Sequence, residues 1–218
     1  SSTSTTQAFE AVGSSLFYLS RDQRILAKVV PDKFIKRRFP IKWLLRDYME
    51  KRWLWQSDAR KEYLSLQILR RAGLKTPECL GWGLSLNPGN RNASLLLMEH
   101  MVHARPGGEL FIAMGEAYRQ RFLDLFCKQV MQLAKAGYLH RDLHYNNLLI
   151  TTGGEFVWID THVKRLPNRQ QDQWLALAKT LTNSKLYGEE YREYVEQQLH
   201  SLWHTDQGLG SSDINSRY

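Results

Sequence analysis

The chain has 218 residues, 43% of them hydrophobic, which suits a folded protein of one domain or two small lobes and excludes a disordered chain. Its longest apolar runs, such as residues 95–98, have only four or five residues, so no transmembrane helix is expected. The net charge of +8 favours an anionic partner: a phosphorylated substrate, an acidic membrane surface or a nucleic acid. Two cysteines, Cys79 and Cys127, lack metal-site spacing and are expected to be reduced thiols of a cytosolic protein.

The first half of the chain is predicted to be rich in strands. Residues 1–7 are rich in Ser and Thr and are expected to form a flexible leader. Alternating or continuous apolar runs bounded by turn residues predict strands at 16–19, 25–30 and 95–98. Ser57 or Asp58 can cap a helix that runs to about residue 72, where Gly73 would end it.

Residues 31–56 form a basic, aromatic insertion that is expected to be partly helical. From Asp32 to Lys61 there are ten Lys and Arg residues against only four acidic ones, and three tryptophans are interleaved with them. This mixture suits a membrane interface, where indole rings lie at the level of the lipid headgroups. The alternative is a solvated basic face with tryptophans in the core.

The second half is predicted to be mainly helical, with helices at 116–136, 172–181 and 189–203 and a polar tail at 208–218. The chain as a whole is therefore expected to have an α+β fold with two lobes. The small β-rich N-lobe would span 8–98, including the insertion, and the helical C-lobe would span 99–207.

The most informative motif is His140-Arg141-Asp142, followed five residues after the aspartate by Asn147. Asp160 comes eighteen residues after Asp142, at the end of a predicted hairpin that would bring it back beside Asn147. This spacing is that of the catalytic and metal loops of the protein-kinase fold. There, the first aspartate accepts the proton of an attacking hydroxyl, and the asparagine and second aspartate hold the Mg²⁺ ions that bridge ATP phosphates. The alternative is an ordinary hairpin with polar ends.

Four more residues are candidates for binding ATP. Lys28 lies in a strand similar to the kinase Val-Ala-Ile-Lys strand and would contact the α- and β-phosphates. Glu62, in the first-lobe helix, would pair with Lys28. Backbone groups of Glu99 and Met101 would bond the adenine edge, with the nucleotide in a cleft between the lobes. The alternatives are that Lys28 is a snorkelling residue, that Glu62 forms a surface salt bridge on its helix, and that residues 99–101 are a plain connector.

Two residues are expected to support the site indirectly. His140 would pack and hydrogen-bond within the catalytic loop. Asp172 would bond the backbone of that loop, or would serve only as a charge at the N-terminus of a helix.

Three features differ from the protein-kinase pattern. No Gly-x-Gly-x-x-Gly loop is present, and Thr161-His162 stands where protein kinases carry Phe-Gly after the metal-binding aspartate. Only about a dozen residues separate Asp160 from the next predicted helix, and no Ala-Pro-Glu occurs. The long segment that binds peptide substrates is therefore expected to be missing.

From residue 16 to about 203, the chain resembles the bacterial lipopolysaccharide core kinases. The matching features are the helix start Ala-Arg-Lys-Glu-Tyr at 59–63, the stretch 69–77, the His-Arg-Asp motif, Ile159-Asp160 and the short segment after it. The resemblance implies an ATP- and Mg²⁺-dependent enzyme that phosphorylates a heptose or Kdo hydroxyl of the inner core, with Asp142 as the base. It further implies a cytoplasmic protein, peripheral at the inner membrane, which acts on a lipid-linked anionic acceptor.

Three other functions fit parts of the pattern. A small protein Ser/Thr kinase would be expected to carry Lys where His144 stands. A non-catalytic pseudokinase or basic binding module would fit the absent Gly-rich loop. An antibiotic or metabolite kinase would usually have Gly where Arg141 stands.

Overall fold

The computed structural model describes residues 15–34, 36–87, 89–90 and 92–211, with side chains described as far as residue 205. The chain divides into two compact units. Unit 1 comprises Ser1–Gln67 and Thr76–His103, and unit 2 comprises Ile68–Lys75 and Ala104–Tyr218.

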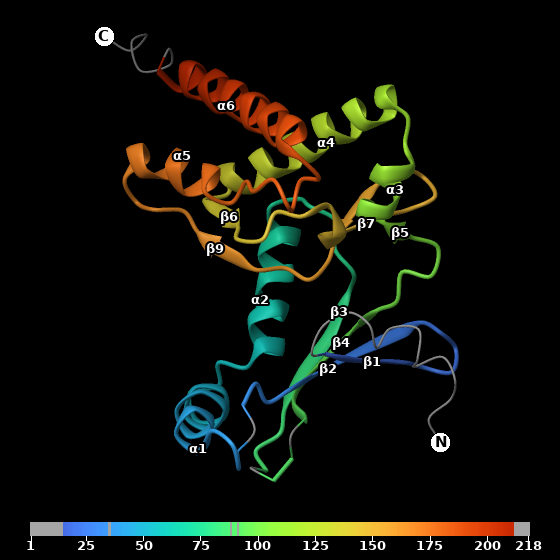
Figure 1. Cartoon of the computed structure of the whole chain (residues 1–218), viewed down its shortest axis with the longest axis vertical. Coiled ribbons are helices and arrows are strands. Elements are labelled where there is room, and N and C mark those ends of the chain that lie inside the picture. The colour runs from blue at the N-terminus through green and yellow to red at the C-terminus, as the bar shows by residue number, and fades with distance from the viewer. Residues whose placement is uncertain (1–14, 35, 88, 91, 212–218) are drawn as a thin grey trace. The chain divides into compact units, whose positions relative to one another are not determined.

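Unit 1 contains an antiparallel sheet of four strands in the order β1-β2-β4-β3 (Figure 1). The strands are β1 (Leu16–Leu19), β2 (Ile25–Pro31), β3 (Cys79–Leu84) and β4 (Asn92–Glu99). In the register of the sheet, Lys28 of the inner strand β2 lies opposite Phe17 and Leu96. A small apolar core combines side chains of β4 with those of the helix that follows the insertion, namely Ala59, Leu66, Leu96 and Met98.

That helix, α2, runs from Asp58 to Arg71. Its start is fixed by Ser57, whose Oγ accepts a hydrogen bond of 3.2 Å from the backbone N–H of Arg60. Its end is fixed by Gly73, which has a φ of +80° that residues with a Cβ rarely adopt. Both ends agree with the predicted cap and stop.

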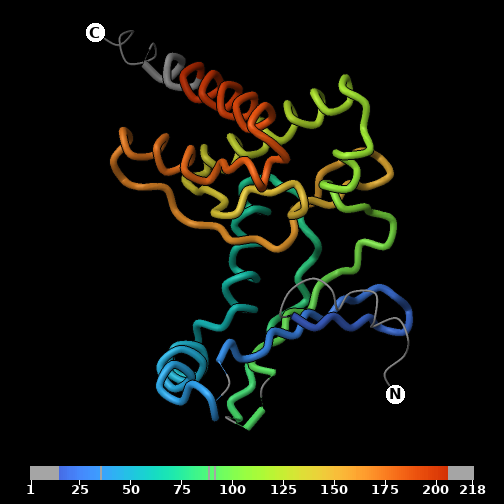
Figure 2. The backbone as a smooth tube through the Cα atoms, in the orientation of Figure 1, coloured from blue at the N-terminus to red at the C-terminus, as the bar shows by residue number. Residues whose placement is uncertain are grey.

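The basic insertion is helical over most of its length. A short α1 (Pro40–Lys42) leads into η2 (Trp43–Trp53), a π-helix whose last turn includes a bond from the N–H of Leu54 to the carbonyl of Met49. Figure 2 shows this segment as a compact light-blue coil. Long π-helices are rare, and most occur as a single turn within an α-helix.

A buried ion cluster ties the start of the insertion to η2. The guanidinium of Arg52 bonds both carboxylate oxygens of Asp32, at 3.0 and 3.1 Å, and the indole N–H of Trp43 donates to the same carboxylate. Lys51 pairs with Asp47 at 2.9 Å, and the backbone N–H groups of residues 33 and 34 also donate to Asp47. The cluster therefore fixes which side of η2 faces inward.

Unit 2 is mainly helical around a large apolar core. Its helices are α3 (Gly107–Ala113), α4 (Glu116–Lys135), the 3₁₀ turn η3 (Tyr145–Asn147), α5 (Gln170–Ala178) and α6 (Glu189–Ser211). Helices α4 and α6 pack against each other (Figure 1). The short strands are β5 (Arg105–Pro106), β6 (Tyr138–His140), β7 (Leu148–Ile150), β8 (Phe156–Trp158) and β9 (Val163–Arg165). They form the sheets β5-β7-β8 and β6-β9.

Two boundaries bear on the predictions from sequence. Helix α6 continues to Ser211 and thus enters the segment 208–218, for which a polar tail was predicted. The predicted leader at 1–7 lies outside the described residues. Within the described part of the chain, no helix has both the length and the apolar character needed to span a bilayer.

Candidate active site

In unit 1, Lys28 and Glu62 form a buried ion pair. The Nζ of Lys28 lies 2.8 Å from Oε2 of Glu62, and both residues are 8% exposed. Strand β2 supplies the lysine and helix α2 the glutamate, so the pair joins the sheet to the helix. Removing two charges from water costs free energy even when they pair with each other. A buried pair of this kind therefore favours a role for Lys28 beyond packing.

In unit 2, the loop after β6 presents Asp142 with its side chain 41% exposed. Two contacts shape the loop. The side-chain Nδ2 of Asn147 donates to the backbone carbonyl of Asp142 at 2.8 Å, and Nδ1 of His144 accepts from the N–H of Asn146 at 3.0 Å. The loop is therefore held by backbone groups, while the Asp142 carboxylate is left accessible to a reactant.

The hairpin β7–β8 brings Asn147 and Asp160 to the same end. Leu148 pairs with Trp158, and the N–H of Ile159 donates to the carbonyl of Asn147 at 2.9 Å. Asp160 follows at once and is exposed, with a φ of +46° that is uncommon outside glycine. Such a conformation usually persists only where the surrounding structure imposes it, and it is frequent at functional sites.

The oxygen donors at this end suit Mg²⁺ and do not suit a metal ion that is held by protein ligands alone. Because the Nδ2 of Asn147 donates within the loop, the amide oxygen is the atom of this side chain that could bind a cation, and the Asp160 carboxylate is a second oxygen donor at the same end of the hairpin. In the described part of the chain, no group of three or more His, Cys, Asp and Glu side chains is arranged to hold a metal. Mg²⁺ keeps several waters and typically binds one or two protein oxygens together with substrate phosphates, so this donor set fits it.

Lys185, which sequence reasoning missed, contacts Asp142. Its Nζ lies 2.5 Å from Oδ1 of Asp142. Burial raises the pKa of Asp142, but the hydrogen bond and charge of Lys185 outweigh that effect and hold the pKa below its usual value. The carboxylate is therefore ionised at neutral pH, as its predicted role as a proton acceptor requires. No motif marks Lys185, since it lies far along the chain from the catalytic loop.

His140 is buried within the catalytic loop, as its predicted supporting role requires. Its Nδ1 accepts from the N–H of Asp142 at 3.2 Å, and its ring packs against Trp158. Burial, with a smaller contribution from His162, lowers the pKa of His140 to about 4. The imidazole is therefore neutral at physiological pH.

This buried histidine predicts a loss of stability in acid. Because the folded-state pKa of His140 is below the ordinary value of 6.5, its contribution is unaffected above pH 6.5 and is lost progressively as the pH falls toward 4. At pH 5 the expected cost is about 2 kcal/mol relative to pH 7. Urea unfolding at both pH values, for wild type and His140→Asn, measures it. The asparagine keeps an acceptor but does not titrate, so equal pH dependence in the two proteins would contradict the prediction.

The remaining predicted residues are less clearly arranged. The N–H of Glu99 donates to the carbonyl of Glu78 at 2.7 Å, which leaves only its carbonyl for an adenine edge. Met101 follows β4 in an irregular, half-buried segment. Asp172 lies in the first turn of α5, and among the described contacts its carboxylate makes no bond to the catalytic loop. Its position fits a helix N-terminal charge better than the predicted loop contact.

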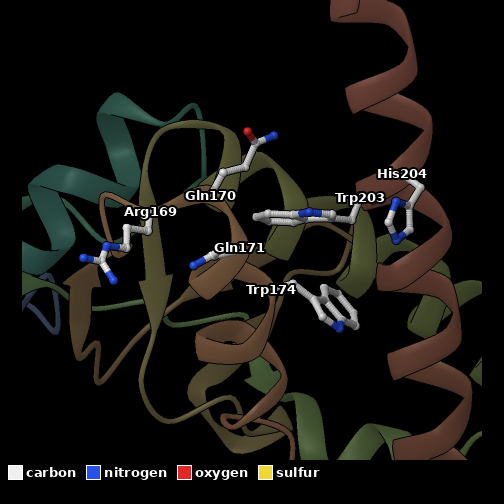
Figure 3. A pocket seen from close by; sticks show the side chains of 6 residues that line it. All are labelled: Arg169, Gln170, Gln171, Trp174, Trp203 and His204. Atoms are coloured by element: carbon white, nitrogen blue, oxygen red, sulfur yellow. The ribbon is translucent and has the colours of Figure 1, made fainter.

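A hollow of about 710 Å³ lies elsewhere on unit 2, between α5 and the end of α6. Its lining, shown in Figure 3, consists of Arg169, Gln170, Gln171, Trp174, Trp203 and His204. None of the predicted site residues lines it.

Comparison with solved structures shows the fold. The chain is 15% identical to a structure described as WaaP in complex with acyl carrier protein, with a TM-score of 0.51 and coverage of 95% of this chain and 88% of that one. It is 16% identical to the bifunctional kinase-methyltransferase WbdD, with a TM-score of 0.53 and coverage of 93% of this chain. The chain spans 46% of that WbdD chain, somewhat less than half. The mixed α and β, kinase-like fold predicted from sequence is thus confirmed.

Comparison with protein families shows the class of reaction. No curated protein sequence matches the chain significantly. A family model described as "Lipopolysaccharide kinase (Kdo/WaaP) family" matches residues 27–204, which is well over half of the chain. The match includes Lys28, Glu62, Asp142, Asn147 and Asp160. The chain therefore belongs to the lipopolysaccharide kinase (Kdo/WaaP) family, a family of ATP-using phosphotransferases that act on sugar hydroxyls.

Proposed function

We propose that this chain transfers the γ-phosphoryl group of ATP to a hydroxyl of heptose or Kdo in the lipopolysaccharide inner core. One observation carries the proposal. The loop that exposes the carboxylate of Asp142 also places Asn147 and Asp160 together at one end of a hairpin. This arrangement is suited to phosphoryl transfer, in which catalysis consists mainly of positioning and charge stabilisation.

Each residue has a distinct role in the proposal. The Asp142 carboxylate orients the acceptor hydroxyl and accepts its proton as the new oxygen–phosphorus bond forms. Asn147 and Asp160 would hold Mg²⁺, which when bound supplies positive charge to the phosphate oxygens. Lys28 would contact the ATP phosphates, and Glu62 would hold the ammonium of Lys28 in position.

Other residues act at a distance from the phosphoryl group. The carbonyl of Glu99 and the backbone of Met101 would meet the adenine edge. His140 would keep the catalytic loop in place through its bond to the N–H of Asp142. Asp172 would support the site only through the negative charge that it places at the start of α5.

The structure disfavours a peptide substrate. Soon after Asp160 the chain enters β9, where Val163 pairs with His140 of β6. Little length remains for a segment that could lay an extended peptide beside Asp142. A compact acceptor such as a sugar needs no such segment.

The assay that tests the proposed function uses purified core acceptors that differ by single sugars. Wild-type protein with ATP and Mg²⁺ should release ADP only with acceptors that contain the target heptose or Kdo. Mass spectrometry of the acceptor should then show the gain of one phosphoryl group on that sugar. Transfer to generic proteins without transfer to core sugars would move the assignment to a protein kinase, and absence of nucleotide binding would favour a non-catalytic module.

We further propose that the insertion contacts the anionic cytoplasmic surface of the inner membrane, where a lipid-linked acceptor would be met. Between residues 39 and 55, large apolar side chains are unusually exposed: Phe39, Ile41, Leu44, Leu45, Tyr48, Met49, Trp53, Leu54 and Trp55. Exposed basic residues accompany them, namely Lys36, Arg37, Arg38, Lys42 and Arg46. Because soluble surfaces rarely gather so many large apolar groups, the combination fits an interfacial helix that meets acidic lipid.

Vesicle binding tests the membrane contact. The double variant Ile41→Ser/Trp53→Ser removes two side chains that are 72% and 70% exposed, so folding should be unaffected. Binding to vesicles that contain phosphatidylglycerol should fall at least about tenfold, because each buried apolar side chain contributes roughly 1.5–3 kcal/mol. Ile112→Ser, which removes a side chain exposed to a similar degree in unit 2, should bind as wild type does. Equal binding by all three proteins, measured by co-sedimentation, would count against the contact.

A further inference from the structure

Lys185 and Asp142 form an ion pair whose side chains are 33% and 41% exposed. An ion pair at a surface contributes little on its own and is often without significance. A pair of this kind is significant only where the fold holds both partners in place, as it does here for Lys185.

The segment that carries Lys185 is fixed to the catalytic loop by its next two residues. Leu186 is fully buried in the core of unit 2. The ring of Tyr187 stacks on that of Tyr145, with centroids 5.6 Å apart, and its hydroxyl donates to Oδ1 of Asn146 at 3.1 Å. Tyr187 has a φ of +60°, a conformation that persists in a bulky residue only where its surroundings impose it.

Helix α3 leaves room for this attachment. A Cβ on Gly108 would come within 1.9 Å of Oδ1 of Asn146 and 2.3 Å of the hydroxyl of Tyr187. The absence of a side chain at Gly108 thus permits the bond between Tyr187 and Asn146. Helix α3, the turn η3 and the segment that precedes α6 therefore cooperate to place Lys185 beside Asp142.

The chemistry requires a cation at this point. The transferring phosphoryl group carries negative charge on its oxygens, and each well-placed positive donor stabilises the transition state. His144, two residues after Asp142, does not meet this need. Its Nδ1 is occupied as the acceptor for Asn146, and its ring lies edge-on to Tyr187, with centroids 5.9 Å apart. Lys185 carries three N–H donors, so bonding Asp142 leaves two for a substrate.

We propose that Lys185 is a second catalytic residue, whose ammonium bonds Asp142 through one N–H and the transferring phosphoryl group through another. This inference rests on the proposed phosphoryl transfer. The acceptor oxygen forms a bond to phosphorus, while the bond from phosphorus to the bridging oxygen breaks and its electron pair leaves with ADP. The hydroxyl proton passes to Asp142, and Lys185 keeps its own protons throughout.

The test compares Lys185→Met, Lys185→Arg and Lys179→Met. The first removes the charge but keeps most of the apolar stem, the second keeps a charge, and the third changes an exposed lysine at the end of α5. For Lys185→Met, kcat should fall about 100-fold or more, with nucleotide affinity and the KM for the acceptor within about threefold of wild type. Lys185→Arg should recover at least tenfold of that loss, and Lys179→Met should match wild type.

Two readouts separate a catalytic role from a structural one and from failure of the proposed function. Thermal unfolding should give the same midpoint for all four proteins within about 2 °C, since the pair is exposed. The slow turnover of ATP by water needs no acceptor, so it tests Lys185 even where wild type fails to phosphorylate the core sugar. A Lys185→Met protein with wild-type rates in both reactions would overturn the proposal, as would a wild type with no turnover of either kind.

Discussion

Replacing Asp142 with asparagine is expected to lower phosphoryl transfer by about 10²–10⁴-fold, the usual contribution of a general base. An amide cannot accept the proton of the acceptor hydroxyl, and it loses the charge that bonds Lys185. The fold should remain intact, because Asn147 bonds the backbone carbonyl of Asp142 and not its carboxylate. Steady-state kinetics with the core acceptor measure the effect, and circular dichroism checks the fold.

Glu190→Gln provides the matched control for this variant, since Glu190 is an exposed acid in the first turn of α6. The control should retain wild-type kcat and KM. If Asp142→Asn kept a kcat within about threefold of wild type, the base would have to lie elsewhere, and the roles given to this loop would be wrong.

Replacing Arg52 with methionine is expected to destabilise the protein by about 3–5 kcal/mol, the usual result of breaking a buried ion pair on one side. Arg52 and Asp32 are only 4% and 6% exposed, and the guanidinium bonds both oxygens of the carboxylate. Without Arg52, the buried carboxylate keeps one partner among those described here, the indole N–H of Trp43. Urea denaturation gives the free energy of unfolding.

The exposed pair between Lys61 and Glu50 supplies the comparison, because its side chains are 46% and 37% exposed at a similar N–O distance of 2.9 Å. Lys61→Met should cost less than about 1 kcal/mol. The double variant Asp32→Asn/Arg52→Met should recover part of the loss, since it leaves no unpaired buried charge. Equal effects of Arg52→Met and Lys61→Met would show that burial of the cluster does not govern its strength.

The parts of the site that sequence could predict are those set by local spacing. The four residues between Asp142 and Asn147 leave room for a turn of 3₁₀ helix, and a hairpin with a short turn returns the chain to Asp160. These relations depend on chain length and strand pairing alone. The Lys28–Glu62 contact was predictable because a strand lysine in a kinase-like chain pairs with an acid on the helix of the same lobe.

Other parts depend on tertiary packing that leaves no local pattern. Lys185 reaches Asp142 only because Leu186 and Tyr187 pack on residues distant in sequence. The pairing of Asp32 with Arg52 joins two members of a charge-rich stretch in which many other pairings are equally compatible with the sequence. The prediction for Asp172 relied on a fold-level precedent, and here the residue does not contact the catalytic loop among the described bonds.

The chain just after Asp160 is fastened closely to the catalytic loop. Thr161 is buried, the N–H of Arg141 donates to the carbonyl of His162 at 2.8 Å, and Val163 is paired with His140. A segment already ordered by these bonds offers little for an added phosphate or a regulatory subunit to reorganise. The extent of core phosphorylation in the cell would then follow the amounts of enzyme, ATP and acceptor. Gene expression and the supply of precursor sugars, rather than modification of this segment, would set the flux.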